Sequence, residues 1–302
     1  MILLDGKKLR DLTADRLKNE VAERLAENEV AVPQLAILQI GDLPESNTYI
    51  AQKKLFAEKI GAKVSHIIHP TKVSEEELIA DIKKLNHDKK VHGIILQLPI
   101  PAELDKNRII DAIDPDKDVD GLTAMNVKRL WTKDEHAIVP ATVLGAIALL
   151  EHYEIPIEGK KVVVVGRSTL VGKPLALALL NENATVTICH RHTENLKEQT
   201  RQADILIVAA GSAHLITKDH VREGQTIIDI GINFEEKTAN EDSKNIHKPE
   251  NEIPKRRMIG DVDFEAVKDI VYAISPVPGG AGPMTVASLF KNLVETWKKQ
   301  SK

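Results

Sequence analysis

The chain has 302 residues, enough for one large or two ordinary domains, and its 42% hydrophobic residues can bury a substantial core. Aromatic residues make up only 3%, so we expect a core of Val, Ile, Leu and Ala, which is typical of buried parallel strands covered by helices. The formal net charge of −4 and the lack of a long basic block argue against nucleic acid as a partner.

The cysteine content and the apolar runs bear on the cellular compartment. Cys189 is the only cysteine, so the chain forms no internal disulfide, as is common in a reducing compartment. The first residues lack an apolar stretch long enough for a signal peptide, and no run of about 18 apolar residues predicts a membrane span. We therefore expect a soluble cytoplasmic protein that does not bind membranes.

In the first half of the chain, short apolar runs alternate with helical patterns. Helices are expected at 44–60 and 75–85, and three strands flank them, at 35–40, 64–68 and 93–98. Alternation of this kind predicts a parallel α/β unit.

A second alternating series follows a helix expected at 143–152. Its predicted helix spans 174–181, and its predicted strands are 161–165, 185–188, 205–208 and 226–230. We therefore predict two α/β domains, the second a Rossmann-like doubly wound parallel sheet, with an active-site cleft between them. The boundary is placed near residue 140, so that 1–139 plus 279–302 form one domain and 140–278 the other. The segment 234–257 is charged and without apolar period, and it predicts an exposed loop rather than a regulatory element.

A glycine-containing turn joins the strand at 161–165 to the next helix. Gly166 permits a sharp exit from the strand, and Gly172 lets the helix start pack close to the sheet, where free N–H groups favour a phosphate. The spacing G-x-S-x-x-x-G differs from the usual dinucleotide-binding pattern G-x-G-x-x-G. The alternative that this is an ordinary strand–turn–helix without a cofactor therefore stays open. Small residues at 209–213 and 229–233 end the following strands, and they either leave room for a ligand or form tight turns.

The residues after the strand at 185–188 bear on cofactor choice. In a doubly wound sheet this position faces the adenine ribose, where an acidic residue favours NAD. Here the chain has His190, Arg191 and His192, with Arg167 in the preceding turn, and such groups suit the 2′-phosphate of NADP. The alternative that Arg191 is an ordinary solvated side chain stays open. Cys189 reads as a small core residue rather than a nucleophile.

Polar side chains in the first half form a candidate chemical site. Ser46, Tyr49 and Lys53 lie on the helix at 44–60, and Tyr49 and Lys53 share a face because they are four residues apart. A solvated helix surface often carries such a pair. Gln97 in an apolar strand needs a polar partner, and Asp120 in an acidic, turn-rich loop is a candidate ligand.

The segment 274–285 holds three glycines and three prolines directly before a helix expected at 286–297. Glycine allows close approach to a ligand, while proline stiffens the path. The composition predicts a rigid, shaped loop of the kind that carries binding residues. The alternative is an ordinary helix entry with Pro283 in its first turn.

Six motifs in chain order carry a family resemblance: YIAQKK (49–54), GIILQLPIP (93–101), KDVDG (117–121), GRSTLVGKP (166–174), GDVDF (260–264) and SPVPGGAGPMT (275–285). Together they closely resemble the bifunctional methylenetetrahydrofolate dehydrogenase/methenyltetrahydrofolate cyclohydrolase family over nearly the whole chain. The resemblance implies oxidation of 5,10-methylenetetrahydrofolate with NADP, then hydrolysis of the methenyl product to 10-formyltetrahydrofolate. It also implies a homodimer formed through the cofactor domain, and a place in one-carbon metabolism and purine biosynthesis.

The resemblance also implies roles for single residues. Lys53 would handle the protons, with burial and a hydrogen bond from Gln97 favouring its neutral amine. Tyr49 would pack along the folate, and Asp120 would accept hydrogen bonds from the pterin. The folate pocket would be lined by Pro278, Gly279 and Gly280. The cofactor side would hold Gly166, Arg167, Ser168, Gly172 and Ile232, to which we add Arg191 on physical grounds; no metal is expected.

Three departures from the family pattern leave questions open. The family usually has Pro-Cys-Thr-Pro where this chain has Pro-Ala-Thr-Val at 140–143. It often has Ser where this chain has Arg191, and that departure leaves NAD open as an alternative to the expected NADP. The segment 234–257 is longer than usual.

Two alternative functions are a dehydrogenase with weak or absent cyclohydrolase activity and a folate- or nucleotide-binding protein without catalysis. The presence of Lys53 and Gln97 argues against the first, and the absence of an apolar substitution at Lys53 argues against the second.

Overall fold

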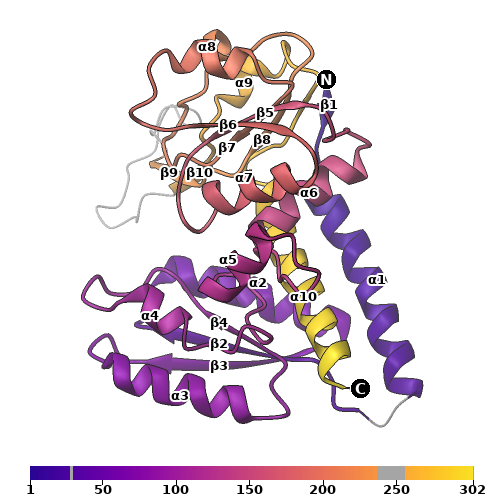
Figure 1. Ribbon diagram of the computed structural model, residues 1–302, viewed down its shortest axis with the longest axis vertical. Helices are drawn as coiled ribbons and strands as arrows, with labels where there is room; N and C mark the ends of the chain where they lie inside the picture. Colours follow the sequence, from indigo (N-terminus) through magenta and orange to yellow (C-terminus); the bar gives the residue numbers. More distant parts are fainter. Residues whose placement is uncertain (28–29, 237–255, 302) are drawn as a thin grey trace, which may run out of the picture.

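The computed structural model describes residues 1–27, 30–236 and 256–301, and it contains two parallel sheets in opposite halves of the molecule (Figure 1). The smaller sheet has the strand order β3-β2-β4, and the larger has the order β1-β11-β8-β7-β5-β6. The prediction of two α/β domains is confirmed. Among the described residues, no helix is long and apolar enough to span a bilayer.

The smaller sheet forms from the three strands expected in the first half. β2 (Gln34–Ile40) is central and runs parallel to β3 (Lys63–His69) and β4 (Gly93–Leu96). Two helices follow β2 and β3, α2 (Pro44–Ile60) and α3 (Glu75–His87). Pro44 starts α2 and the left-handed Gly61 ends it, while Ser74 and Glu77 form a capping box that starts α3.

The larger sheet has the doubly wound arrangement. Its strands are all parallel: β5 (Lys161–Val165), β6 (Thr185–Cys189), β7 (Ile205–Val208), β8 (Thr226–Asp229), β11 (Ala273–Ile274) and β1 (Ile2–Leu3). β5 lies between β6 and β7, so the chain leaves β5 to one side and later returns to the other. In such sheets ligands bind beyond the carboxyl ends of the strands at this switch point. Cys189 is fully buried in the core beside this sheet, as expected.

Three long helices connect the two halves: α1 (Gly6–Glu27), α6 (Ala141–His152) and α10 (Ala281–Gln300). α10 packs against both α6 and α1, and it runs beside α1 in Figure 1. A single buried apolar cluster extends from Leu35 in β2 through these helices to Val164 in β5. Phe290 and Trp297 of α10 lie fully inside it, and truncating either to Ala would cost about 3–5 kcal/mol of stability.

Several predicted limits differ from the structure. β4 ends at Leu96, before a cis peptide bond between Leu98 and Pro99, so Gln97 follows the strand rather than lying in it. α7 (Gly172–Asn181) begins at Gly172 rather than at Pro174, and α10 begins at Ala281, because Pro residues are tolerated within a first helical turn.

The prediction of a loop at 234–257 is wrong at both ends of the segment. β9 (Asn233–Glu236) and β10 (Arg256–Ile259) pair there as an antiparallel ribbon, since main-chain pairing with a partner strand does not require an apolar period. Residues 237–255 lie outside the described part of the chain.

Other elements were not predicted, the largest being α1. Its buried Ala14, Leu17 and Val21 follow helical spacing, a signal that was present in the sequence. The two-residue strands β1 and β11 were not predicted either. The shorter unpredicted helices are α4 (Lys106–Ile110), α5 (Ala124–Trp131), α8 (Leu196–Arg201), the 3₁₀ turn η1 (Lys218–His220) and α9 (Phe264–Val267).

Candidate active site

Lys53 and Gln97 meet at the carboxyl end of the smaller sheet. Lys53 projects from α2, and its Nζ donates a hydrogen bond to Gln97 Oε1 at 2.8 Å. Gln97 is only 8% exposed, and its Nε2 donates to the Leu98 carbonyl at 2.8 Å. The polar partner that the sequence required for Gln97 is therefore Lys53 on one side and the main chain on the other.

The direction of this hydrogen bond corrects the expectation that Gln97 donates to the amine. The Gln97 amide N–H is already used by Leu98, so only its carbonyl oxygen faces Lys53. A carbonyl acceptor holds an ammonium at least as well as a neutral amine, so Gln97 orients the side chain without favouring deprotonation. Burial is what lowers the pKa of Lys53, and the nearby Asp120 carboxylate partly opposes it by raising that pKa.

Asp120 is electrostatically coupled to Lys53 across this site. Burial raises the pKa of Asp120 to about 6, the Lys53 cation lowers it, and the neighbouring Asp118 carboxylate raises it. Tyr49 lies one helical turn before Lys53 on α2 and is partly buried, and this burial raises the pKa of its hydroxyl. Ser46, on the same helix, is buried. The structure therefore groups Lys53, Gln97 and Asp120, with Tyr49 on the adjoining turn.

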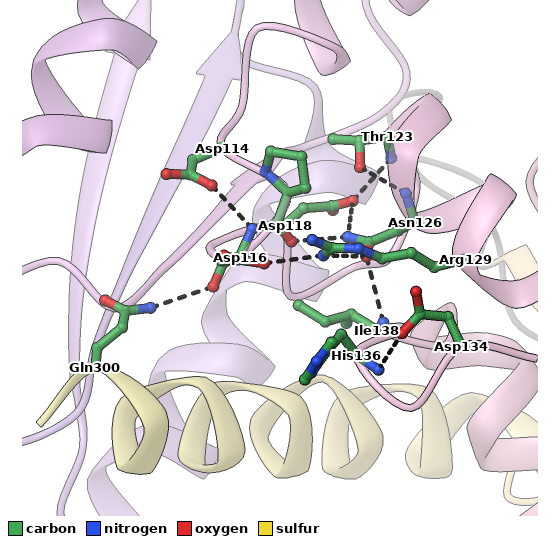
Figure 2. Close-up of polar contacts among 11 residues, drawn as sticks. Asp114, Asp116, Asp118, Thr123, Asn126, Arg129, Asp134, His136, Ile138 and Gln300 are labelled. Atoms are coloured by element: carbon green, nitrogen blue, oxygen red, sulfur yellow. Dashed lines mark hydrogen bonds and ion pairs between the residues drawn. The ribbon is translucent and has the colours of Figure 1, made fainter. Parts of the chain in front are cut away.

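The buried carboxylate of Asp118 fixes the loop that carries Asp120, and Figure 2 shows its contacts with Thr123 and Asn126. Asp118 accepts three hydrogen bonds of 2.8–3.0 Å, from the main-chain N–H groups of Gly121 and Thr123 and from Asn126 Nδ2. Asn126 also accepts from the Ile138 N–H at 3.3 Å, which ties the loop to the segment before α6. The sequence marked Asp120 in this acidic, turn-rich loop as a candidate ligand, but it did not indicate that Asp118 holds the loop in place.

The Gly-Pro loop before α10 is seated on the first turn of α1. A cis peptide bond precedes Pro278, Gly279 has a φ of 121°, and the Gly279 carbonyl accepts from the Gly6 N–H at 2.9 Å. A Cβ on Gly6 would lie 1.8 Å from the Gly280 carbonyl oxygen, so only glycine fits there. Pro278 is exposed, whereas Gly279 and Gly280 are buried. The expected rigid shape therefore comes from packing against α1, although its last five residues, 281–285, are already helical.

A cavity of about 610 Å³ opens beyond the carboxyl ends of β5, β6 and β7, at the switch point of the larger sheet. Its described lining includes Gly166, Arg167, Ser168, His190, Arg191, Ala209, Ala210 and Ser212. Within the described residues this lining carries two guanidinium groups and no carboxylate, which suits a ligand with several phosphates. Gly166 has a φ of 134° and passes so close to Ala209 that a Cβ would lie 2.2 Å from the Ala209 carbonyl oxygen.

Two other predicted cofactor residues lie outside this lining. In the described part of the chain, the cavity lining does not include Gly172 or Ile232. Gly172 lies behind the turn, where a Cβ would meet the Gly166 carbonyl oxygen at 2.3 Å, and the exposed Ile232 follows β8. Arg191 does line the cavity, and its Nε donates to His192 Nε2 at 3.1 Å, so it has a partner as well as solvent contact.

Two family models match the chain in succession. The catalytic domain of tetrahydrofolate dehydrogenase/cyclohydrolase matches residues 4–120, and the NAD(P)-binding domain of the same family matches residues 140–301.

Curated relatives are similar along nearly the whole chain. The bifunctional protein FolD of Lactobacillus helveticus is 42% identical over 299 residues, which cover 99% of this chain and 98% of the relative. That of Francisella philomiragia is 44% identical over 292 residues, covering 97% and 96%.

Solved structures are similar over the same length. The bifunctional FolD methylenetetrahydrofolate dehydrogenase/cyclohydrolase from Campylobacter jejuni is 40% identical, with a TM-score of 0.89 and 99% of each chain covered. The Trypanosoma brucei methylenetetrahydrofolate dehydrogenase-cyclohydrolase, complexed with NADP cofactor and inhibitor, is 32% identical, with a TM-score of 0.90 and 99% and 98% covered.

Proposed function

The chain belongs to the tetrahydrofolate dehydrogenase/cyclohydrolase family, and we propose that the residues around Lys53 and the cavity beyond β5 serve both reactions on one bound folate. The enzyme oxidises 5,10-methylenetetrahydrofolate to 5,10-methenyltetrahydrofolate with NADP, then hydrolyses it to 10-formyltetrahydrofolate. The observation that carries the residue assignment is the Lys53 amine, held 2.8 Å from Gln97 Oε1 and coupled to Asp120.

The oxidation depends mainly on positioning. Bound NADP supplies the hydride acceptor, and the protein holds the methylene carbon of the folate against it. With a pKa of about 6, Asp120 is mostly a carboxylate at neutral pH and can accept hydrogen bonds from the amino and ring N–H groups of the pterin. Tyr49 offers an apolar ring face along the folate, and the backbone of 278–280 offers a rigid wall.

The hydrolysis also requires proton transfer. Water adds to the methenyl carbon and loses one proton, which gives a neutral hydroxyl adduct. When the C–N bond then breaks, the ring nitrogen takes up a proton and the hydroxyl of the adduct releases its own as the formyl carbonyl forms, so that one proton is released overall. Burial lowers the pKa of Lys53, so more of its amine is neutral and able to accept the first proton. The resulting ammonium then donates a proton to the ring nitrogen. Gln97 keeps the amine at its place through both steps.

The cavity beyond β5 suits NADP by its chemistry. Arg167 and Arg191 provide cationic groups for the phosphates, including the 2′-phosphate, and Gly166 and Ser168 form the turn beside them. Ser168 Oγ accepts from the Gly172 N–H at 3.3 Å, so Gly172 supports that turn from behind. Ile232 remains a predicted contact at the neighbouring strand end.

We further propose that the enzyme works in the cytoplasm as a homodimer that provides one-carbon units for purine biosynthesis, and that its domains divide as 1–139 plus 279–302 and 140–278. β6 supports a dimer through the cofactor domain, because it is an edge strand whose Ile188 is 43% exposed. An Ile188→Lys variant should sediment as a monomer if this edge forms the interface, and an unchanged dimer would locate the interface elsewhere.

A spectroscopic assay of the purified protein tests the function. The protein is mixed with 5,10-methylenetetrahydrofolate and either NADP or NAD, and methenyl absorbance is followed. Transient methenyl that decays to 10-formyltetrahydrofolate is expected with NADP. Methenyl that accumulates without enzymatic decay would indicate a dehydrogenase alone, and complete inactivity with bound folate would indicate a binding protein.

A further inference from the structure

Asp261 is fully buried behind the NADP cavity and belongs to the GDVDF motif, to which neither reaction gives a role. Its Oδ2 accepts from the main-chain N–H groups of Ala210 at 2.6 Å and Gly211 at 2.9 Å. Its Oδ1 accepts from the Ser212 N–H at 2.8 Å and from Asn233 Nδ2 at 2.9 Å. Three consecutive N–H groups of one loop thus converge on a single carboxylate.

We propose that Asp261 is a positioning residue for the dehydrogenase reaction, holding 210–212 as the wall against which the adenosine part of NADP binds. Ala210 and Ser212 line the cavity, while the carboxylate that fixes them lies behind it. The same cavity contains Arg191 at the end of β6, the strand end that faces the adenine ribose in doubly wound sheets. This inference rests on NADP binding in this cavity.

Asp261 is itself held in place by a second buried carboxylate. Asp229, at the end of β8, accepts from the Asp261 N–H at 3.2 Å, and its own N–H donates to Ser275 Oγ at 2.8 Å. Two glycines leave the space that these carboxylates occupy. A Cβ on Gly231 would lie 2.1 Å from Asp261 Cγ, and one on Gly260 would lie 1.9 Å from Asp229 Oδ2. The fold therefore provides both the space and a hydrogen-bond partner that hold Asp261 in place.

The two activities of the enzyme separate a positioning role from a general structural one, because the cyclohydrolase reaction needs no dinucleotide. Asp261→Asn preserves volume but replaces one acceptor oxygen with an NH₂ group, so two of the four hydrogen bonds are lost. We expect KM for NADP to rise about tenfold or more, since small misplacements of a binding group cost up to about 100-fold. Hydrolysis of added 5,10-methenyltetrahydrofolate and KM for the methylene substrate should stay at wild-type values.

Binding of 2′,5′-ADP, measured by calorimetry, tests the adenosine wall directly and should weaken to a similar extent in Asp261→Asn. Asp263→Asn is the matched control. Asp263 lies in the same motif and caps α9 by accepting from the Ala266 N–H at 3.1 Å, and Asn caps helices equally well. This control should keep the wild-type KM for NADP and the wild-type affinity for 2′,5′-ADP.

Wild-type affinities for NADP and 2′,5′-ADP in Asp261→Asn would overturn the proposal, and so would equal losses of both activities in a natively folded variant. Should Asp261→Asn fail to fold, Asn233→Ala decides, because it removes one donor and leaves the carboxylate with its three main-chain partners. A smaller rise in KM for NADP with unchanged hydrolysis supports the proposal, and no rise refutes it. Lack of NADP-dependent oxidation by the wild-type chain would instead refute the proposed function.

Discussion

Replacing Lys53 with Met tests the proton-transfer assignment most directly. Met has a similar length and an apolar end, so α2 keeps its packing while the amine that donates to Gln97 Oε1 at 2.8 Å is lost. Proton transfer by a positioned side chain contributes about 10²–10⁴-fold to a rate. We therefore expect kcat of the cyclohydrolase to fall by about 10²–10⁴-fold, equivalent to about 3–5 kcal/mol in the barrier.

The same substitution has a second, electrostatic effect on Asp120. The Lys53 cation lowers the pKa of Asp120, which is about 6 with the lysine present. Without it, that pKa rises and more of the carboxyl is protonated at pH 7. KM for the folate should therefore increase at neutral pH and recover as the pH is raised, because only the ionised carboxylate accepts two hydrogen bonds at once.

The assay follows the decay of added 5,10-methenyltetrahydrofolate and, separately, the binding of NADP by calorimetry. Lys54→Met is the control, since Lys54 is the next residue on α2 but is exposed and contacts His66 instead. Lys53→Met should lose hydrolysis and keep its affinity for NADP, and Lys54→Met should keep both. Hydrolysis at the wild-type rate in Lys53→Met would refute the role of the amine.

Three further predictions concern binding. Arg191→Ala should raise KM for NADP by about tenfold, as expected for the loss of one charge-assisted contact, and change KM for NAD little; equal losses would argue against a 2′-phosphate contact. KM for the methylene substrate should rise as the pH falls through about 6, because Asp120 becomes protonated there and no longer acts as a pure acceptor; a flat profile from pH 7 to 5 would contradict this. Gly6→Ala should raise the folate KM in both reactions and lower the melting temperature, because its Cβ would meet the Gly280 carbonyl oxygen at 1.8 Å, whereas Gly282→Ala has open space and should change neither; wild-type kinetics for Gly6→Ala would mean that the loop does not line the folate pocket.

Local patterns in the sequence were enough to predict most of the two sheets. The run KVVVV at 161–165 is almost wholly buried as β5, and an apolar segment of this kind between turns predicts a buried parallel strand. The capping residues Ser74 and Glu77 mark the start of α3 in the same way. α1 went unpredicted because charged residues dominate its surface, although the three buried positions at helical spacing were present.

The pairing of Lys53 with Gln97 depends on topology more than on any motif. The two residues are 44 positions apart, and they meet because α2 returns from β2 over the end of β4, which pairs with β2. The sequence indicated that Gln97 needed a partner, and the family resemblance indicated which. Neither indicated that its amide N–H is taken by Leu98, because that depends on how the chain turns after β4.

Two buried aspartates show why one kind of structural residue is easier to find from sequence than another. Asp118 bonds to groups three to eight residues away, so its role lies in a local turn that the KDVDG motif already suggests. Asp261 bonds to N–H groups 49–51 residues away, and its motif shows no sign of them. Both aspartates nevertheless stabilise a loop in the same way. Burying a carboxylate costs free energy unless several N–H groups donate hydrogen bonds to it, and the groups that do so are then fixed in place. One aspartate thereby holds the loop that carries Asp120 and the other holds the wall of the cavity beyond β5, so that a buried acid keeps each of these two loops rigid.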